Sequence, residues 1–571
     1  MNNLKSSLRR RWIQSDLKVK LLSILLGLIP VGIALWVWLS PLAFVPVPWP
    51  DDSAFYFVGR DFFQWPPRWV MIPQAPFEPS YRIFNFNTMP LYPILIGLGR
   101  FVGIDGSFGI KFWPLCAWAL TGSLLSVVLF RSGLPILISA LLGLAVGLDP
   151  ILRWASVLVR PESLIGLIGM ALVLGLALGI PAKFRTKGLW DPVAALLALA
   201  AYSHFNAIHL LFPVIVFHFL EPLRLFAIAW RTALYLLPWL VLVLWHWGLF
   251  VHQMTTQWTR LAVANNWLDS IASAINGLLQ NLGSPEAWPA QIYLLGMGLW
   301  LLIFCAAVFA LCDLYLAFWK PERRTTRRLA PAATWVLSSV WLWHTKPEVW
   351  FVYYIHIALW CFAGLVLLEA WRNRKQFFGK FTFAAGALLL VTLTSVSGYV
   401  DGVQFIKLRS SSSWNRDTYH EFISCIDQRL EEEWRRVRAI LPDRTFTVWN
   451  PTFPDVTVEL SRRHPDWEFT RTNDFSERSQ LALQHGRDVD AVVVSETLQW
   501  QERDISGPLE EHPEISSVWM NWGGYFLKTL WTEKGWKPVR YLCQRGRWQA
   551  FMFMNAPRPR LSTHSAPGEQ E

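Results

Sequence analysis

The chain has 571 residues, of which 53% are hydrophobic and 16% charged, with 35 Trp and a formal net charge of +11. Its mean hydropathy is +0.29, and its apolar residues fall in runs of about 20 that stop near residue 398. These values exclude a soluble globular domain, a disordered chain and a disulfide scaffold, and they predict one large membrane domain followed by a polar tail.

The positive charge reflects membrane topology rather than a polyanionic partner. Most Lys and Arg residues before residue 400 fall in short clusters between apolar runs, which is the pattern of cytoplasmic loops. We therefore expect membrane lipids around the chain and no nucleic acid.

The N-terminus predicts a membrane anchor. Basic residues precede an apolar run from Leu21 to about Val45. The apolar part of a signal peptide is shorter than this run, so the sequence predicts an uncleaved signal-anchor helix with a cytoplasmic N-terminus. Residues 46–108 then form the first outer loop.

Further apolar runs bring the predicted number of membrane crossings to about eleven. They lie at 109–130, 134–149, 162–181, 190–203, 205–220, 226–250, 290–317, 330–344, 349–371 and 381–398. The basic clusters between the runs should all be cytoplasmic, and this parity requires a hairpin turning near His204. It also excludes a crossing by Met89–Gly103, which we interpret as a segment on the outer interface.

The predicted fold is an α-helical polytopic membrane domain, residues 1–400, followed by an extracytoplasmic domain, residues 401–571. The second domain should be a small α/β domain, because short apolar or alternating runs are separated by helix-like stretches. The strand-like runs are 445–449, 491–494 and 549–554, and the helix-like stretches are 419–440 and 476–485.

The six cysteines show no metal-binding spacing. Only Cys425 and Cys543 could pair, and only if the tail lies in an oxidising compartment. The anchor and the topology are compatible with a multi-pass protein of a bacterial plasma (inner) membrane.

Polar side chains gather at the predicted outer ends of the helices. They are Asp51, Asp52, Arg60, Asp61, Arg68, Glu78 and Arg82 in the first outer loop, then Arg153, Arg160, Glu162, His204, His209, His246, His252, Arg260, His344, Lys346 and His356. A single interfacial His or loop acid is usually an ordinary surface residue. A rim of carboxylates and cations at one leaflet, however, suits a reaction on an anionic, lipid-borne substrate.

Two motifs within this rim are candidates for chemistry. The adjacent carboxylates of Asp51 and Asp52 could act as a general base or bind a divalent cation such as Mg²⁺ or Mn²⁺, although an Asp at a helix N-cap would explain them equally well. The sequence Arg160-Pro161-Glu162 opens the fourth predicted helix. Its ordinary interpretation is a helix start with Pro at the first helical position and an acid in the first turn.

These motifs together resemble the C-type glycosyltransferase (GT-C) superfamily, which includes the protein O-mannosyltransferases and the bacterial aminoarabinose transferases. The resemblance lies in DDSAFYFVGRDFF after the first helix, then PLYP, then RPE at the outer start of the fourth helix, and TKPEVWFVYY entering the tenth. It covers roughly residues 20–370.

The resemblance implies an enzyme that transfers a sugar from a polyprenyl-phosphate carrier to an acceptor hydroxyl on a protein, lipid or glycan at the outer face. It implies that Asp51 or Asp52 is the base, with or without a bound divalent metal, and that Glu162 is the acid of the fourth helix. His204 stands in the hairpin turn, where the family often has Lys. The candidate phosphate-binding cations are Lys346, Arg160, Arg153 and Arg60, and a single displacement would invert the anomeric centre.

Two other classes of function compete with this interpretation. A lipid or solute transporter or flippase would need charges near the membrane midplane and on both sides of it, whereas Asp313 and Glu369 lie close to the predicted inner ends. A non-catalytic scaffold protein would need neither the paired acids nor the RPE motif. The asymmetry of the charges favours the enzyme.

Overall fold

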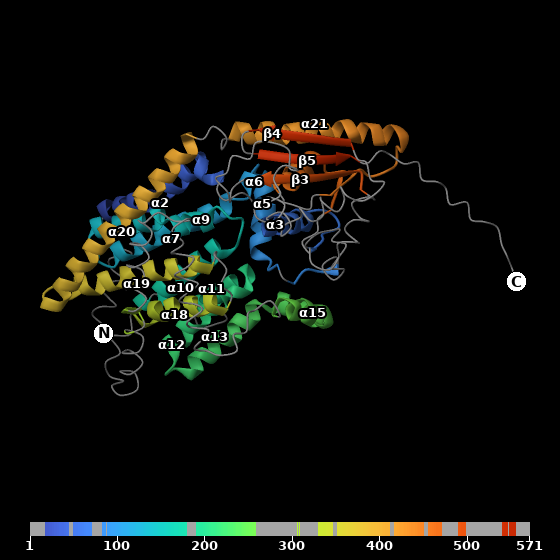
Figure 1. Cartoon of the computed structure of the whole chain (residues 1–571). Helices are drawn as coiled ribbons and strands as arrows, with labels where there is room; N and C mark the ends of the chain where they lie inside the picture. Colours follow the sequence, from blue (N-terminus) through green and yellow to red (C-terminus); the bar gives the residue numbers. More distant parts are fainter. Residues whose placement is uncertain are drawn as a thin grey trace. The chain divides into compact units, whose positions relative to one another are not determined.

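The computed structural model consists of two compact units, whose elements are drawn in Figure 1. The described residues are 17–44, 50–70, 83–86, 88–179, 190–258, 305–306, 308, 329–345, 351–410, 416–449, 455–470, 489–497, 539–545 and 548–554. The membrane unit comprises Met1–Pro46, Phe55–Trp69 and Phe84–Ser411, and the C-terminal unit comprises Val47–Ala54, Val70–Ile83 and Ser412–Glu571.

The described part of the membrane unit is helical. Its elements up to the hairpin are α2 (Leu17–Leu39), η1 (Pro41–Phe44), α3 (Pro50–Phe62, which the unit boundary divides), α5 (Leu91–Phe101), α6 (Gly106–Gly109), α7 (Phe112–Arg131), α8 (Ile136–Leu148), α9 (Pro150–Ser156), α10 (Glu162–Leu178) and α11 (Pro192–Ser203). The later ones are η3 (Phe205–Leu210), α12 (Leu211–His218), α13 (Pro222–Tyr235), α14 (Leu237–Trp245), α15 (Trp247–Trp258), α18 (Ala330–Thr345), α19 (Val352–Arg372) and α20 (Phe377–Ser410).

Several of these helices identify the chain as a membrane protein. Within the described residues, four helical segments are long and apolar enough to cross a membrane: α2, α7, α19 and the Phe377–Val403 part of α20. The pairs α8–α9 and α13–α14 are bent by 55° and 65°, and they raise the number to six if each pair is one span. The predicted total of about eleven stays a prediction, and the run 290–317 lies mostly outside the described residues.

Local capping makes some helices shorter than the apolar runs that contain them. The α10 helix begins at Glu162 after Pro161 and ends at Leu178. The next residue, Gly179, has a left-handed φ of 67° and stops the helix before the predicted end. The run 190–220 breaks at His204, which has an extended backbone and accepts a hydrogen bond at Nδ1 from the Asn206 N–H, 3.1 Å away. This break lies where the charge parity requires a turn.

The segment after the first outer loop is too short to cross a membrane. The α5 helix has 11 residues, which corresponds to about 16 Å at the usual rise per residue. It packs tightly on α3, because a Cβ atom at Gly97 would lie only 2.5 Å from the carbonyl oxygen of Gly59. This length agrees with the prediction of a segment that does not span.

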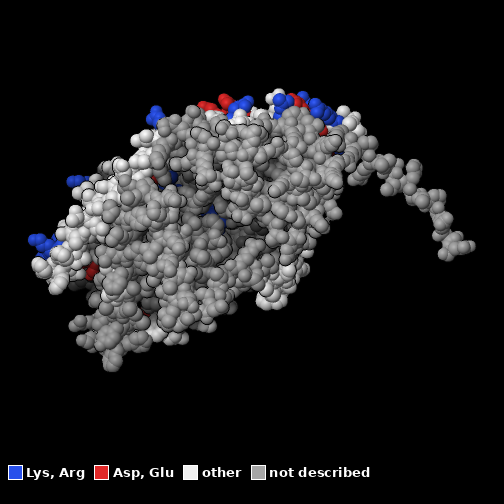
Figure 2. All heavy atoms as spheres, viewed as in Figure 1, with Lys and Arg blue, Asp and Glu red and all other residues white. Residues whose placement is uncertain are grey.

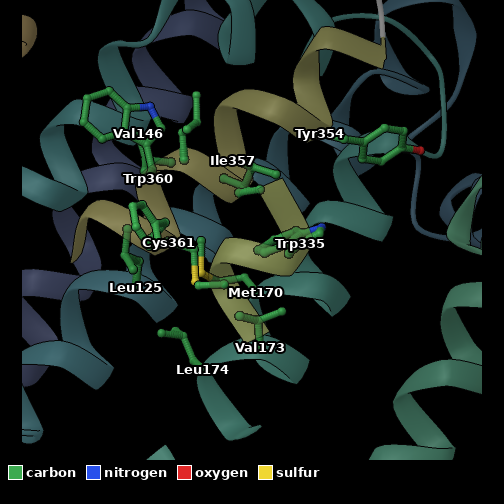
Figure 3. Packing of buried hydrophobic residues seen from close by; sticks show 14 of the residues in the cluster. Leu125, Val146, Met170, Val173, Leu174, Trp335, Tyr354, Ile357, Trp360 and Cys361 are labelled. Carbon is green, nitrogen blue, oxygen red and sulfur yellow. The ribbon is translucent and has the colours of Figure 1, made fainter. Parts of the chain in front are cut away.

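The core of the membrane unit is centred on α7, α10 and α19. Figure 3 shows Met170 of α10 beside Cys361 of α19, and both belong to one buried cluster with Val173, Leu174 and Trp360. A second buried cluster joins Val58, Trp69 and Phe86 to Trp239 and Val243 of α14. These contacts hold the outer-loop segment against the later helices.

The described part of the C-terminal unit is an α/β arrangement built around one sheet. Its elements are α21 (Arg416–Ile440), β1 (Thr447–Trp449), α22 (Asp455–Arg463), β2 (Glu468–Thr470), β3 (Ala491–Thr497), β4 (Val539–Arg545) and β5 (Trp548–Met554). The strand order is β2-β1-β3-β5-β4. The β1 strand pairs in parallel with β2 and β3, whereas the β3–β5 and β4–β5 pairs are antiparallel.

The sheet contains the three strand-like runs of the sequence, and α21 corresponds to the helix-like stretch 419–440. The other helix-like stretch, 476–485, lies outside the described residues. Figure 2 shows acidic and basic side chains interspersed over α21, where Arg435 pairs with Glu431 at 3.0 Å and Arg429 with Glu432 at 3.1 Å. The charges on this helix are therefore largely balanced locally.

A carboxylate joins α21 to α22. Asp427 accepts hydrogen bonds from Arg463 Nη1 and His464 Nε2, each at 2.6 Å. Burial would raise the pKa of Asp427, but the bonds from His464 and Arg463 outweigh it and hold this pKa below its usual range. The ionised carboxylate therefore links the two helices at neutral pH.

The two cysteines singled out in the tail form a disulfide. Cys425 of α21 and Cys543 of β4 are bonded, with Cα atoms 5.9 Å apart. This separation lies within the range that a disulfide can bridge. Disulfides persist in oxidising compartments, so the bond supports the expectation that this unit lies outside the cytoplasm.

Removing this crosslink should destabilise the C-terminal unit. We expect a Cys425→Ser, Cys543→Ser variant to lose up to about 5 kcal/mol of unfolding free energy, because the bond spans a sequence separation of 118 residues. Thermal unfolding of the full-length protein with and without reductant measures the effect, and Cys116→Ala serves as the control with an unpaired cysteine. Free thiols at both positions in protein taken from its native membrane would contradict the bond.

Candidate functional site

Polar and charged side chains are buried within the helices of the membrane unit. We call the following residues the buried polar cluster: Asp149, Arg153, Arg160, Glu162, His209, Tyr354, His356 and Asp401. Each is at most 5% exposed. Ionisable groups inside an apolar helix bundle are costly to desolvate, so their collection in one region marks a candidate functional site.

Asp149 stands at the bend between α8 and α9. Its Oδ1 accepts hydrogen bonds from the backbone N–H groups of Ile151 and Leu152, at 2.9 and 3.1 Å, and so caps α9. Its Oδ2 lies 2.8 Å from His356 Nδ1 and 2.9 Å from Trp360 Nε1, one turn apart on α19. Asp149 therefore fixes the start of α9 against α19.

Arg153 of α9 forms an ion pair with Asp401 of α20. The Nε atom of Arg153 lies 2.8 Å from Oδ1 of Asp401, and both side chains are almost completely buried. A buried pair of this kind is strongly destabilised when only one partner is removed. One candidate phosphate-binding residue, Arg153, is therefore paired with a helix that is distant in the sequence.

Arg160 and Glu162, which the sequence analysis names together, also meet in the structure. Both Nε and Nη2 of Arg160 lie 3.2 Å from Oε1 of Glu162. Oε2 of Glu162 is buried and has no hydrogen-bond partner among the described residues. Glu162 is the first residue of α10, where the helix dipole favours a carboxylate.

Two aromatic side chains complete the cluster beside this pair. Nδ1 of His209 lies 2.6 Å from the carbonyl oxygen of Asn206, and the His209 ring centroid is 4.7 Å from that of Tyr354. Tyr354 interacts electrostatically with Glu162 and Arg160. In Figure 3 its hydroxyl points away from the other labelled residues, so the ring lies at the margin of the apolar core.

The other site residues predicted from the sequence do not belong to the buried polar cluster. Asp51 and Asp52 lie in the first turn of α3 rather than in a loop, and their side chains are outside the described atoms, as is Lys346. Arg60 pairs with Asp61 at 2.7 Å and lies 4.7 Å from the Phe57 ring. His204 caps η3.

Metal binding is untested at the paired acids. Within the part of the chain that the structure describes, no group of three or more His, Cys, Asp or Glu residues could hold a metal ion. The side chains of Asp51 and Asp52 are not among those residues, so a cation at these two acids stays a prediction.

Sequence reasoning missed Asp149 and Asp401 and did not assign Tyr354 to the site. Asp149 does carry a local signal, because Asp followed by Pro after an apolar run is a typical helix start. Asp401 was read as the first residue of the polar tail. Its partner Arg153 is 248 positions away in the sequence, so no local pattern could have paired them.

Comparison with known proteins identifies the fold. No family model and no curated protein sequence matches the chain. Two solved structures of ArnT from Cupriavidus metallidurans, one bound to undecaprenyl phosphate and one in the apo state, each cover 93% of this chain and 99% of their own at 11% identity. Their TM-scores are 0.51 and 0.52, respectively.

An archaeal protein gives a weaker likeness. The oligosaccharyltransferase from Archaeoglobus fulgidus, in its apo form, matches at 12% identity and a TM-score of 0.48, over 84% of this chain and 70% of its own. The two ArnT matches show that the chain has the fold of ArnT, which agrees at the level of the fold with the resemblance of the sequence motifs.

Proposed function

We propose that this protein is a membrane glycosyltransferase that moves a sugar from a polyprenyl-phosphate carrier to an acceptor hydroxyl at the outer face of the membrane. The observation that carries the proposal is the ArnT fold over 93% of the chain, with buried ion pairs inside the helices of the membrane unit. The solved ArnT that shares this fold was bound to undecaprenyl phosphate. Such a carrier is the anionic, lipid-borne substrate that the outer polar rim suits.

The proposed reaction is one displacement at the anomeric carbon. The bond from the acceptor oxygen to that carbon forms while the bond to the carrier phosphate breaks, so the configuration inverts. Asp51 or Asp52 takes the proton of the acceptor hydroxyl as general base. Cations stabilise the negative charge that grows on the leaving phosphate.

The candidate phosphate-binding residues differ in their ion-pair partners. Arg153 is paired with Asp401, and Arg60 with Asp61. Arg160 is itself paired with Glu162. In our proposal Arg160 and Lys346 hold the phosphate, and Glu162 orients the Arg160 guanidinium. His204 caps η3 through Nδ1, and we assign it a secondary part at the rim.

A divalent cation at Asp51 and Asp52 belongs to the proposal. Carboxylate oxygens are the ligands that Mg²⁺ and Mn²⁺ prefer, and a cation there would neutralise charge beside the acceptor. We further propose that the protein lies in the plasma membrane with a cytoplasmic N-terminus and an extracytoplasmic C-terminal unit. The disulfide supports an extracytoplasmic position of the C-terminal unit. In our proposal the acceptor is a lipid, a glycan or a protein.

The test is a transfer assay with the purified protein in lipid. Radiolabelled sugars on polyprenyl phosphate are offered with membrane, glycan and peptide acceptors, with divalent cations added or chelated. We expect release of the carrier phosphate together with acceptor labelling, and the chelated arm decides whether a metal is needed. Movement of intact carrier between leaflets without any transfer would instead favour the transporter.

A further inference from the structure

Among the buried polar atoms of the membrane unit that have no hydrogen-bond partner within the described residues, four lie on elements that pack together. They are Oε2 of Glu162, Nε2 of His209, Nε1 of Trp335 and the hydroxyl of Tyr354. They come from α10, η3, α18 and α19, respectively, and α18 contacts the other three elements. A buried polar atom without a partner is costly, so four in one region point to a ligand that supplies the missing bonds.

Three of these side chains are neighbours, and the fourth, Trp335, packs on the same elements. The rings of His209 and Tyr354 are 4.7 Å apart, and Tyr354 interacts electrostatically with Glu162. The edge of the Trp335 indole lies over Gly169 of α10, where a Cβ atom would be 2.6 Å from it and 3.0 Å from Leu210, the residue after His209. Figure 3 shows the Trp335 nitrogen and the Tyr354 hydroxyl pointing to the same side of the apolar cluster.

The chemistry of the four atoms defines what they can bind. The contact of His209 Nδ1 with a carbonyl oxygen requires a proton on Nδ1, so a neutral imidazole presents a lone pair at Nε2. Oε2 of Glu162 also accepts, the Trp335 indole only donates, and the Tyr354 hydroxyl does both. A partner must therefore both donate and accept, as sugar hydroxyls do.

Charge argues against an ion at these four atoms, as distinct from the phosphate that we propose at Arg160. The carboxylate of Glu162 is already paired with Arg160, so the pair has no net charge. A phosphate oxygen would face a carboxylate oxygen and an imidazole lone pair, whereas an ammonium group would face the donor-only indole. A polyprenyl chain has no polar atom to offer.

We propose that Glu162, His209, Trp335 and Tyr354 form a binding site for a neutral sugar ring. The hydroxyls of the ring donate to Glu162 and His209 and accept from Trp335, and the aromatic faces of His209 and Tyr354 cover its apolar side. This inference rests on the proposed function for the source of the sugar, which is either the lipid-linked donor or a glycan acceptor.

The test compares lipids with and without a sugar. Binding of polyprenyl-phosphate glucose, polyprenyl-phosphate mannose, a polyprenyl-phosphate aminopentose and sugar-free polyprenyl phosphate is measured on the full-length protein in nanodiscs. We expect the neutral hexose lipids to bind about tenfold more tightly than the sugar-free lipid. Tyr354→Phe and His209→Phe should each reduce this ratio to near one while leaving the affinity for the sugar-free lipid unchanged.

Tyr353→Phe is the matched control, because the Tyr353 hydroxyl is also buried and without a partner among the described residues, but its ring packs on Gly166 of α10. It should keep the tenfold ratio. A preference for sugar that survives both the Tyr354 and His209 changes would overturn the site, and so would an aminopentose bound more tightly than the hexoses. Size-exclusion profiles check that each variant is folded.

Soluble methyl glucoside and methyl mannoside distinguish a donor sugar from an acceptor sugar. They also test the sugar site independently of the proposed function, because they carry no lipid. Saturation-transfer NMR should show their contact with the wild type and with Tyr353→Phe, and its loss in Tyr354→Phe. Contact of the glycosides without any preference among the lipids would assign the site to an acceptor sugar. If the wild type binds no carrier lipid, the proposed function is wrong. The sugar site is then tested by the glycosides alone, and a wild type that does not contact them would overturn the site.

Discussion

Replacing Asp51 and Asp52 together by Asn should reduce sugar transfer by a factor of about 10²–10⁴, because an amide cannot take the proton of the acceptor hydroxyl. Asn has nearly the same shape as Asp, and the two positions lie in the first turn of α3, where a neutral side chain is tolerated. The measurement is acceptor labelling by wild type and variant at equal amounts of inserted protein. The single variants then identify which carboxylate is the base.

Asp105→Asn is the matched control for these changes. Asp105 is an acid of the same predicted outer loop, it pairs with Arg100 at 3.4 Å, and the proposed reaction does not use it. It should retain transfer. Full activity in the Asp51, Asp52 double variant would show that the base lies elsewhere and would remove the central assignment of the mechanism.

The two buried arginine pairs should differ in their importance for activity when each is removed separately. An Arg153→Met, Asp401→Leu variant removes one pair completely, and an Arg160→Met, Glu162→Leu variant removes the other. Replacing both partners of a buried pair by apolar residues is often neutral for stability, so we expect both double variants to fold. Only the second should lose transfer, by about 10²–10³, because Arg160 stabilises the leaving phosphate in our proposal.

Single changes give the stability control for this comparison. Arg153→Met alone leaves Asp401 charged and buried, and it should lower the free energy of unfolding by about 3–5 kcal/mol. Thermal unfolding in nanodiscs measures the loss and its recovery in the double variant. A folded Arg153→Met, Asp401→Leu protein without transfer would instead make Arg153 a phosphate ligand, and full transfer without Arg160 would remove that residue from the reaction.

Features that depend on neighbouring residues could be predicted from the sequence alone. The apolar runs within the described residues became helices, the run 190–220 broke at His204, and α5 was too short to cross. The pairing of Cys425 with Cys543 could be anticipated because the other four cysteines lie in apolar runs. Length, hydropathy and capping act within a few residues, so one sequence is sufficient for them.

The partners of the buried charges were decided only by the tertiary structure. Arg153, Arg160, Glu162, His209 and His356 were recognised as polar residues at the outer ends of helices. The pairing of Arg160 with Glu162 and the contact of His209 with Asn206 are local, but the other partners named here are distant in the sequence. Asp149 meets His356 across 207 positions, and Arg153 meets Asp401 across 248. In an apolar bundle a charged group must find a partner, and which one it finds depends on which helices pack side by side.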